Sequence, residues 1–239
     1  MSAKKITKKL NIELIIFDLD GTLVDSRKDI TKAVNFTLRE AGLKEKSMQE
    51  VSSFIGWGVK DLIAKSLGDG NSHLFDKSLA IFEKYYRKHA TDNSILYPGA
   101  KEILEYFKDK RKVIVTNRNQ EFAVLALKNL GIYDYFNDII GADNAGCVKP
   151  SACPLDNIIE KLKISKSRVI IIGDMVIDVL AGKSAGIFTC AVTYGLGKKE
   201  DIIKSNPDYI IDDILKLKNI INTNAISKMS LRGGAEAIP

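Results

Sequence analysis

The stretch LIIFDLDGT, which runs from Leu14 to Thr22, indicates both a fold class and a chemistry. Its first four residues are apolar and two of them are β-branched, which is typical of a parallel strand buried on both faces. Asp18 and Asp20 follow at once, and residues two apart in an extended chain share a side. Two neighbouring carboxylates repel each other and need a proton or a cation to coexist, and oxygen-only ligands suit Mg²⁺. We therefore expect a cation site where this strand ends.

Further apolar runs of similar length follow along the chain, separated by helical patterns. An alternation of strand and helix predicts an α/β fold with a doubly wound parallel sheet. The strands are expected at 113–115, 169–172 and 190–192, and helices at 121–130 and 178–185.

One long interval interrupts this alternation, because the next strand after the first begins only near Lys112. The sequence of this interval predicts helices: Ser47 and Glu50 fit a capping box, and the stretch Phe75–Tyr86 has one apolar face. A connection of this length should itself be structured, so we predict an inserted helical cap. The predicted division is an α/β core at 1–24 and 97–225, a cap at 25–96 and a mobile tail at 226–239.

Composition narrows the class of protein. The chain has 239 residues, and its 36 Lys and Arg against 30 Asp and Glu give a net charge of +6. The basic residues are dispersed, which favours a solvated surface over a nucleic-acid partner. No apolar run reaches membrane-spanning length. Cys147, Cys153 and Cys190 lack metal-site spacing, which predicts reduced thiols in a cytoplasmic protein. The chain is expected to be a monomer or a homodimer.

Three more polar segments stand at predicted strand ends, the edge of a parallel sheet where ligands bind. Thr116 and Asn117 offer a hydroxyl and backbone N–H groups for phosphate oxygens. Lys149, before a proline, supplies a cation that could neutralise the same phosphate. Asp174 and Asp178 follow the strand at 169–172 and could complete a metal site.

These four segments, in this order, resemble the haloacid-dehalogenase-like superfamily over residues 13–213. The inserted helices are similar to the α-helical cap of its phosphoglycolate phosphatases and β-phosphoglucomutases. The resemblance implies that Asp18 is the nucleophile that forms an aspartyl-phosphate, and that Asp20 exchanges protons with the leaving alcohol and with water. It also implies a Mg²⁺ cofactor. The implied metal residues are Asp18, Asp20 (through its main-chain carbonyl), Asp174 and, as a supporting acid, Asp178.

The same resemblance suggests which residues bind the phosphate. Lys149 begins the stretch KPSACPL, similar to the family's K-P-x-x-x-P-L, although Ala152 stands where the family often has proline. The helix after it should start at Pro154. The implied phosphate-binding residues are Gly21, Thr22, Thr116, Asn117 and Lys149.

In the predicted cap, the stretch GWGVK resembles the G-x-G loop with which such caps touch the leaving group. The candidate substrate residues are Gly56, Trp57, Gly58 and Lys60, with Lys60 the charge expected to meet an anionic substrate. A plain interhelical turn explains the two glycines equally well.

The leading hypothesis is therefore a Mg²⁺-dependent hydrolase of a small phosphate ester, with 2-phosphoglycolate as the first candidate. The alternatives are a phosphomutase of the β-phosphoglucomutase type and a pyrophosphatase or nucleotidase. Asp20 argues against a dehalogenase, since the family's dehalogenases lack that second carboxylate. A non-catalytic binding protein is disfavoured because the catalytic positions are all present.

Overall fold

A computed structural model describes residues 9–143 and 146–223. Within them, six parallel strands form one sheet in the order β5-β4-β1-β6-β7-β8, which confirms the predicted α/β class. The tail predicted for residues 226–239 lies outside the described residues. The strands are β1 (Leu14–Phe17), β4 (Arg111–Val115), β5 (Asp138–Ile140), β6 (Val169–Gly173), β7 (Phe188–Val192) and β8 (Tyr209–Ile211).

The central strand β1 aligns the predicted motifs. Its last residue, Phe17, lies opposite Ile114 of β4 on one side and Ile172 of β6 on the other. The three strands therefore end at nearly the same level, and the polar residues that follow them come out at one edge of the sheet.

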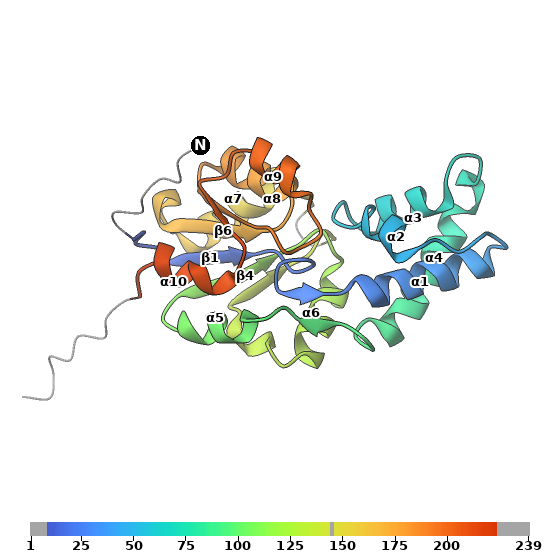
Figure 1. Cartoon of the computed structure of the whole chain (residues 1–239), viewed down its shortest axis with the longest axis horizontal. Helices are drawn as coiled ribbons and strands as arrows, with labels where there is room; N and C mark the ends of the chain where they lie inside the picture. The colour runs from blue at the N-terminus through green and yellow to red at the C-terminus, as the bar shows by residue number, and fades with distance from the viewer. Residues whose placement is uncertain (1–8, 144–145, 224–239) are drawn as a thin grey trace, which may run out of the picture.

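Helices cover both faces of the sheet (Figure 1). The side chains of β1 alternate between the two: Ile15 and Phe17 belong to one apolar cluster, and Leu14 and Ile16 to the other. The first cluster is completed by α5 (Ala100–Tyr106), α6 (Gln120–Asn129), η4 (Ile214–Lys216) and α10 (Leu217–Ile220). The second is completed by α7 (Cys153–Leu162) and α8 (Val176–Ala185), and α9 (Lys199–Lys204) packs beside α8.

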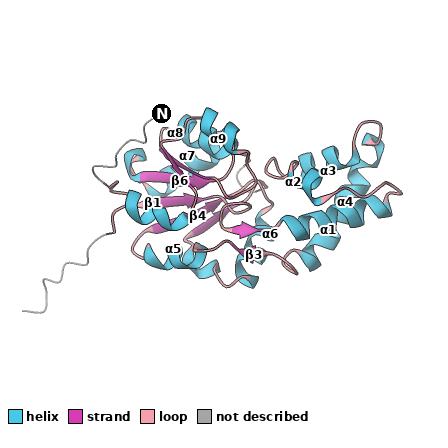
Figure 2. Ribbon diagram, viewed as in Figure 1, coloured by secondary structure: helices cyan, strands magenta, loops and turns pink. Residues whose placement is uncertain are grey.

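The helices α1 to α4, called the cap below, stand apart from the sheet (Figure 2). The chain enters and leaves the cap through a short antiparallel ribbon, β2 (Val24–Asp25) with β3 (Ile95–Leu96). The capping box of Ser47 and Glu50 is confirmed at the start of α2. The cap's apolar cluster also includes Phe122 of α6, so cap and core share a packed contact. The helices are α1 (Arg27–Glu40), α2 (Met48–Ser52), α3 (Val59–Leu67) and α4 (Phe75–His89).

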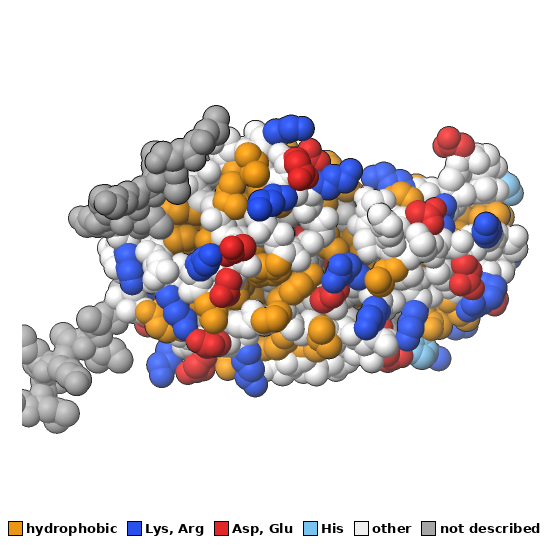
Figure 3. All heavy atoms as spheres, in the orientation of Figure 1, with side chains coloured by type: hydrophobic (Ala, Val, Ile, Leu, Met, Phe, Trp, Pro, Cys, Tyr) orange, Lys and Arg blue, Asp and Glu red, His pale blue; other side chains and the backbone are white. Residues whose placement is uncertain are grey.

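Charged side chains of both signs are interspersed on the face seen in Figure 3, without a broad basic patch. Among the described residues, none of the helices is both long and apolar enough to cross a membrane. Single-turn helices complete the fold: η1 (Ser72–Leu74), η2 (Tyr133–Tyr135) and η3 (Lys166–Arg168).

Candidate active site

Lys149 lies at the centre of the candidate site. It enters from the loop between β5 and α7, and its side chain is 1% exposed. Its Nζ donates to Asp18 Oδ1 at 2.8 Å and to Asp178 Oδ1 at 2.7 Å. Burial opposes the charge on Lys149, but the two carboxylates outweigh it and raise the lysine's pKa. A permanent cation thus joins residues from two different strand ends.

Three buried carboxylates form a cluster at this site, and two of them bond to Lys149. Asp18, Asp174 and Asp178 each have an oxygen within 4.8 Å of the others. Burial raises the pKa of Asp18 to about 7 against the pull of Lys149, and burial with the neighbouring acids raises the pKa of Asp174 well above its usual range. One lysine does not balance three carboxylates, so a further cation would stabilise the group. A set of oxygen ligands in a pocket with more carboxylates than cations fits Mg²⁺.

Gly21 and Thr22 position Asp174. Gly21 has φ +90°, and a Cβ there would lie 2.2 Å from Asp174 Oδ2, so only glycine permits this close approach. The Thr22 hydroxyl donates to Asp174 Oδ1 at 2.9 Å, and the Leu196 amide donates to Oδ2 at 2.6 Å. Both residues are predicted to bind the phosphate. In the structure Gly21 leaves room for the Asp174 carboxylate, and the Thr22 hydroxyl donates to that carboxylate.

Asp20 is held by a residue that sequence reasoning missed. Arg118 donates from Nε to Asp20 Oδ2 at 2.9 Å and from Nη2 to Oδ1 at 2.5 Å, and the Ser26 hydroxyl also donates to Oδ1. The bidentate ion pair is buried, and Asp20 outweighs the effect of burial to raise the pKa of Arg118. The available signal was an arginine directly after Thr116 and Asn117, at the end of a buried strand.

Asn117 ties three segments together. Its Oδ1 accepts from the Lys149 amide at 2.9 Å, and its Nδ2 donates at 2.9 Å to the carbonyls of Lys149 and of Gly56 in the cap. The side-chain amide is thereby occupied with main-chain partners. The neighbouring Thr116 hydroxyl accepts from the Arg118 amide at 3.2 Å. Asn117 therefore holds the Lys149 loop, and only its main chain is left to meet a phosphate.

A cavity between core and cap opens onto these groups. Asp18, Asp20, Thr116 and Arg118 line it from the core, and Gly56, Gly58 and Tyr86 are among the residues that line it from the cap.

Two of the candidate cap residues lie elsewhere. Trp57 is 47% exposed and faces a separate surface hollow beside Met175 and Ile177. Lys60 is exposed at the start of α3 and is not among the residues that line the cavity. Among the described residues that line the cavity, the cation is Arg118; Lys149 is not one of them, but it bonds to Asp18, which is.

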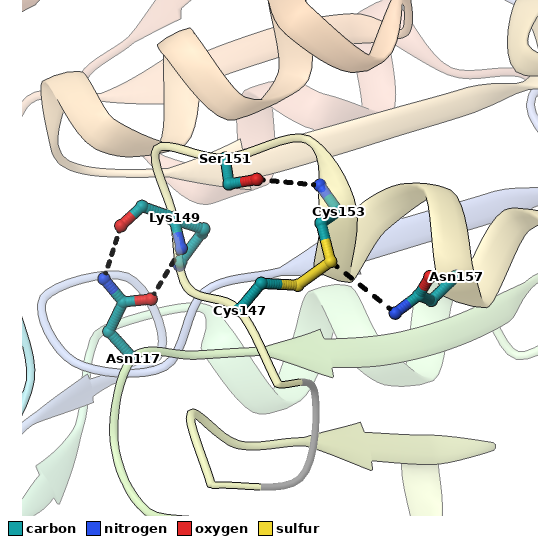
Figure 4. Close-up of a disulfide and its surroundings, with 6 residues drawn as sticks. All are labelled: Asn117, Cys147, Lys149, Ser151, Cys153 and Asn157. Carbon is teal, nitrogen blue, oxygen red and sulfur yellow. Dashed lines mark hydrogen bonds between the residues drawn. A yellow bond between two sulfur atoms is a disulfide. The ribbon is translucent and has the colours of Figure 1, made fainter.

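A disulfide encloses the Lys149 loop, which corrects the expectation of three reduced thiols (Figure 4). Cys147 and Cys153 are bonded, with their Cα atoms 6.2 Å apart. The chain reverses between them, and Cys153 opens α7, one residue earlier than expected, where Asn157 Nδ2 donates to its Sγ at 3.8 Å. Residue spacing could not reveal this pairing, because it depends on the path of the loop. Cys190 is a buried free thiol.

The geometry agrees with the comparisons to known proteins. The sequence profile of the family described as haloacid dehalogenase-like hydrolase matches residues 15–192, which include all four strand-end segments. The chain is a haloacid dehalogenase-like hydrolase.

Relatives of this hydrolase match almost over their whole lengths. The phosphoglycolate phosphatase of Nitrosococcus oceani is 33% identical over 220 residues, covering 89% of this chain and 98% of the relative. That of Vibrio parahaemolyticus is 33% identical over 224 residues, covering 90% and 98%. A crystal structure described as a predicted phosphoglycolate phosphatase from Haemophilus somnus superposes with a TM-score of 0.82 at 30% identity, covering 87% and 97%.

Proposed function

We propose that this phosphatase is a Mg²⁺-dependent phosphomonoester hydrolase that forms an aspartyl-phosphate on Asp18, with 2-phosphoglycolate as its first candidate substrate. The observation that carries the proposal is the position of the Asp18 carboxylate. It lines the cavity, hydrogen-bonds to Lys149 and belongs to a three-carboxylate cluster suited to a cation. The names of the curated relatives support the choice of substrate.

In the first step an Asp18 oxygen forms a bond to phosphorus while the bond from phosphorus to the leaving oxygen breaks. Lys149 offsets the repulsion between the carboxylate and the phosphate, and Thr116 lies in the same cavity to bind a phosphate oxygen. Mg²⁺, held by Asp18, Asp174 and the main-chain carbonyl of Asp20, with Asp178 in support, would supply charge neutralisation at the phosphoryl oxygens.

Asp20 has two tasks in this scheme. It gives a proton to the leaving alcohol, and it then takes one from the water that attacks phosphorus and releases free phosphate from Asp18. The bidentate bond from Arg118 fixes the position of the Asp20 side chain for both tasks. For the first, Asp20 must carry a proton once the substrate is bound.

A phosphate-release screen over small phosphate esters, sugar phosphates, nucleotides and pyrophosphate tests the proposal, with Mg²⁺ and with EDTA. We expect Mg²⁺-dependent release from 2-phosphoglycolate, and none with Asp18→Asn. Asp92→Asn, which alters an exposed carboxylate bonded to His89, is the matched control and should retain turnover. A labelled, hydroxylamine-sensitive acyl phosphate should appear in the wild type. Undiminished turnover by Asp18→Asn would refute the mechanism.

The same screen separates the alternatives. A phosphomutase of the β-phosphoglucomutase type converts one hexose phosphate into its isomer without accumulating phosphate, and a pyrophosphatase or nucleotidase would prefer those members of the panel. A monomeric or dimeric state and a cytoplasmic location stay predictions. In a reducing cytosol the Cys147–Cys153 pair would be held as thiols.

A further inference from the structure

Two buried polar atoms in the candidate active site have no hydrogen-bond partner among the described residues. They are Nη1 of Arg118 and the hydroxyl oxygen of Tyr86. Both residues line the cavity that contains Asp18 and Asp20. The two groups lie near each other, but neither makes a well-formed hydrogen bond to a described residue. Buried polar groups are nearly always paired, so two such groups on residues that line one cavity indicate a missing ligand.

The two groups come from opposite sides of the cavity. Arg118 follows β4 in the core, and Tyr86 is on α4 in the cap, with the guanidinium carbon 5.3 Å from the centre of the tyrosine ring. Asp20 occupies the Nε and Nη2 edge of the guanidinium, which leaves Nη1 for a second partner. A ligand that reaches Nη1 is therefore held between core and cap.

Both groups are hydrogen-bond donors. Arg118 is a buried cation, and burial raises the pKa of the Tyr86 hydroxyl, so that it keeps its proton. Two convergent donors, one of them charged, select an anionic acceptor.

The rest of the cap wall is apolar, formed by Ile30, Ile55, Leu62 and Phe82 among others. Such a wall offers no partners for the several hydroxyls of a sugar, which disfavours a hexose phosphate.

We propose that Arg118 and Tyr86 form a subsite for a carboxylate on the leaving group, so that the preferred substrates are phosphate esters of short hydroxy acids. The inference rests on the proposed function and narrows its substrate class. A carboxylate suits the subsite better than a second phosphoryl group, because it adds less negative charge beside Asp18 and Asp20. The first candidate, 2-phosphoglycolate, belongs to this class.

The subsite also orients the leaving group. The substrate carboxylate and Asp20 bind neighbouring edges of one guanidinium. When the ester oxygen is one carbon away from that carboxylate, it is brought beside Asp20, the proposed proton donor. Catalytic efficiency should therefore fall as methylene groups are inserted between the carboxylate and the phosphate ester.

The test compares 2-phosphoglycolate with 2-hydroxyethyl phosphate, in which a neutral CH₂OH replaces the carboxylate. The measured quantity is the ratio of the two kcat/KM values. We expect a ratio above about ten in the wild type, and a decrease of about tenfold in Tyr86→Phe, which removes one hydrogen bond to a charged acceptor. Tyr85→Phe, one residue away, stacked on Phe36 and in contact with the His89 ring, makes the same chemical change outside the cavity lining and should keep the wild-type ratio.

Arg118→Lys retains a cation but not the fork, so it should lower the same ratio further. Because its bond to Asp20 also changes, only the ratio and not the absolute rate is diagnostic. A measurement without any variant is inhibition of the wild type, in which glycolate should compete at least tenfold better than ethylene glycol.

The outcomes distinguish a failure of the proposed function from a failure of the carboxylate subsite. Phosphate release from neither ester would defeat the proposed function itself. Release from both esters at equal efficiency, or a ratio that Tyr86→Phe leaves unchanged, would overturn the carboxylate subsite alone. Faster release from pyrophosphate than from 2-phosphoglycolate would assign the two donors to a phosphoryl group and would likewise overturn it.

Discussion

Replacing Asn117 by alanine should destabilise the protein and disable its lysine. The Asn117 side chain makes three hydrogen bonds of 2.9 Å, two to the main chain of Lys149 and one to the carbonyl of Gly56. At about 1 kcal/mol for each bond, their loss should lower the free energy of unfolding by about 3 kcal/mol. The Lys149 loop also loses the contact that fixes its Nζ between Asp18 and Asp178, so kcat should fall by at least about tenfold.

Equilibrium unfolding in urea measures the first effect, and phosphate release at saturating substrate measures the second. Asn129→Ala is the matched control, because its amide makes one exposed bond, to Thr91, and its loss should cost less than about 0.5 kcal/mol. Asn117→Asp keeps the acceptor for the Lys149 amide but loses both donors, so its stability should fall below that of the wild type. An Asn117→Ala protein with unchanged stability and unchanged kcat would refute the role of Asn117 as a clamp.

Three other predictions concern the surroundings of the site. Gly21→Ala places a Cβ 2.2 Å from Asp174 Oδ2 at φ +90°. The free energy of unfolding, measured in urea, should fall by about 1–3 kcal/mol, and the affinity for Mg²⁺, measured by calorimetry, should fall as well. Wild-type values for both quantities would contradict this prediction. The pKa of Asp18 is raised from 3.8 to about 7, so the metal-free protein should lose stability as the pH rises through that window and ionises the buried acid. Mg²⁺ binding should therefore release more protons at pH 6 than at pH 8.5, where Asp18 is already ionised. Calorimetry in two buffers of different ionisation enthalpy measures this release, and an equal release at both pH values would refute the prediction. Reducing the Cys147–Cys153 disulfide should lower the free energy of unfolding by about 2 kcal/mol, since it closes a short loop; Cys153→Ser should match the reduced wild type and be insensitive to dithiothreitol.

The sheet and the residues at its edge were predictable because their signals are local. An apolar run such as Leu14–Phe17 can be satisfied only by burial on both faces, and parallel strands end at a common edge. The sequence accordingly indicated that Asp18, Thr116, Lys149 and Asp174 would converge. Strands β5 and β8 were not predicted because each contains only two consecutive aliphatic residues, a shorter run than those of the predicted strands.

The partners of those residues were decided by tertiary packing. Arg118 meets Asp20 across 98 positions of sequence, and Tyr86 reaches the same cavity only because the cap packs on α6. Trp57 and Lys60 stand in the same short stretch as Gly56 and Gly58, yet they point elsewhere. A sequence motif specifies which chemical groups are available at a strand end. Which side chain from another element completes their hydrogen bonds depends on how the two domains pack, and no local pattern encodes that.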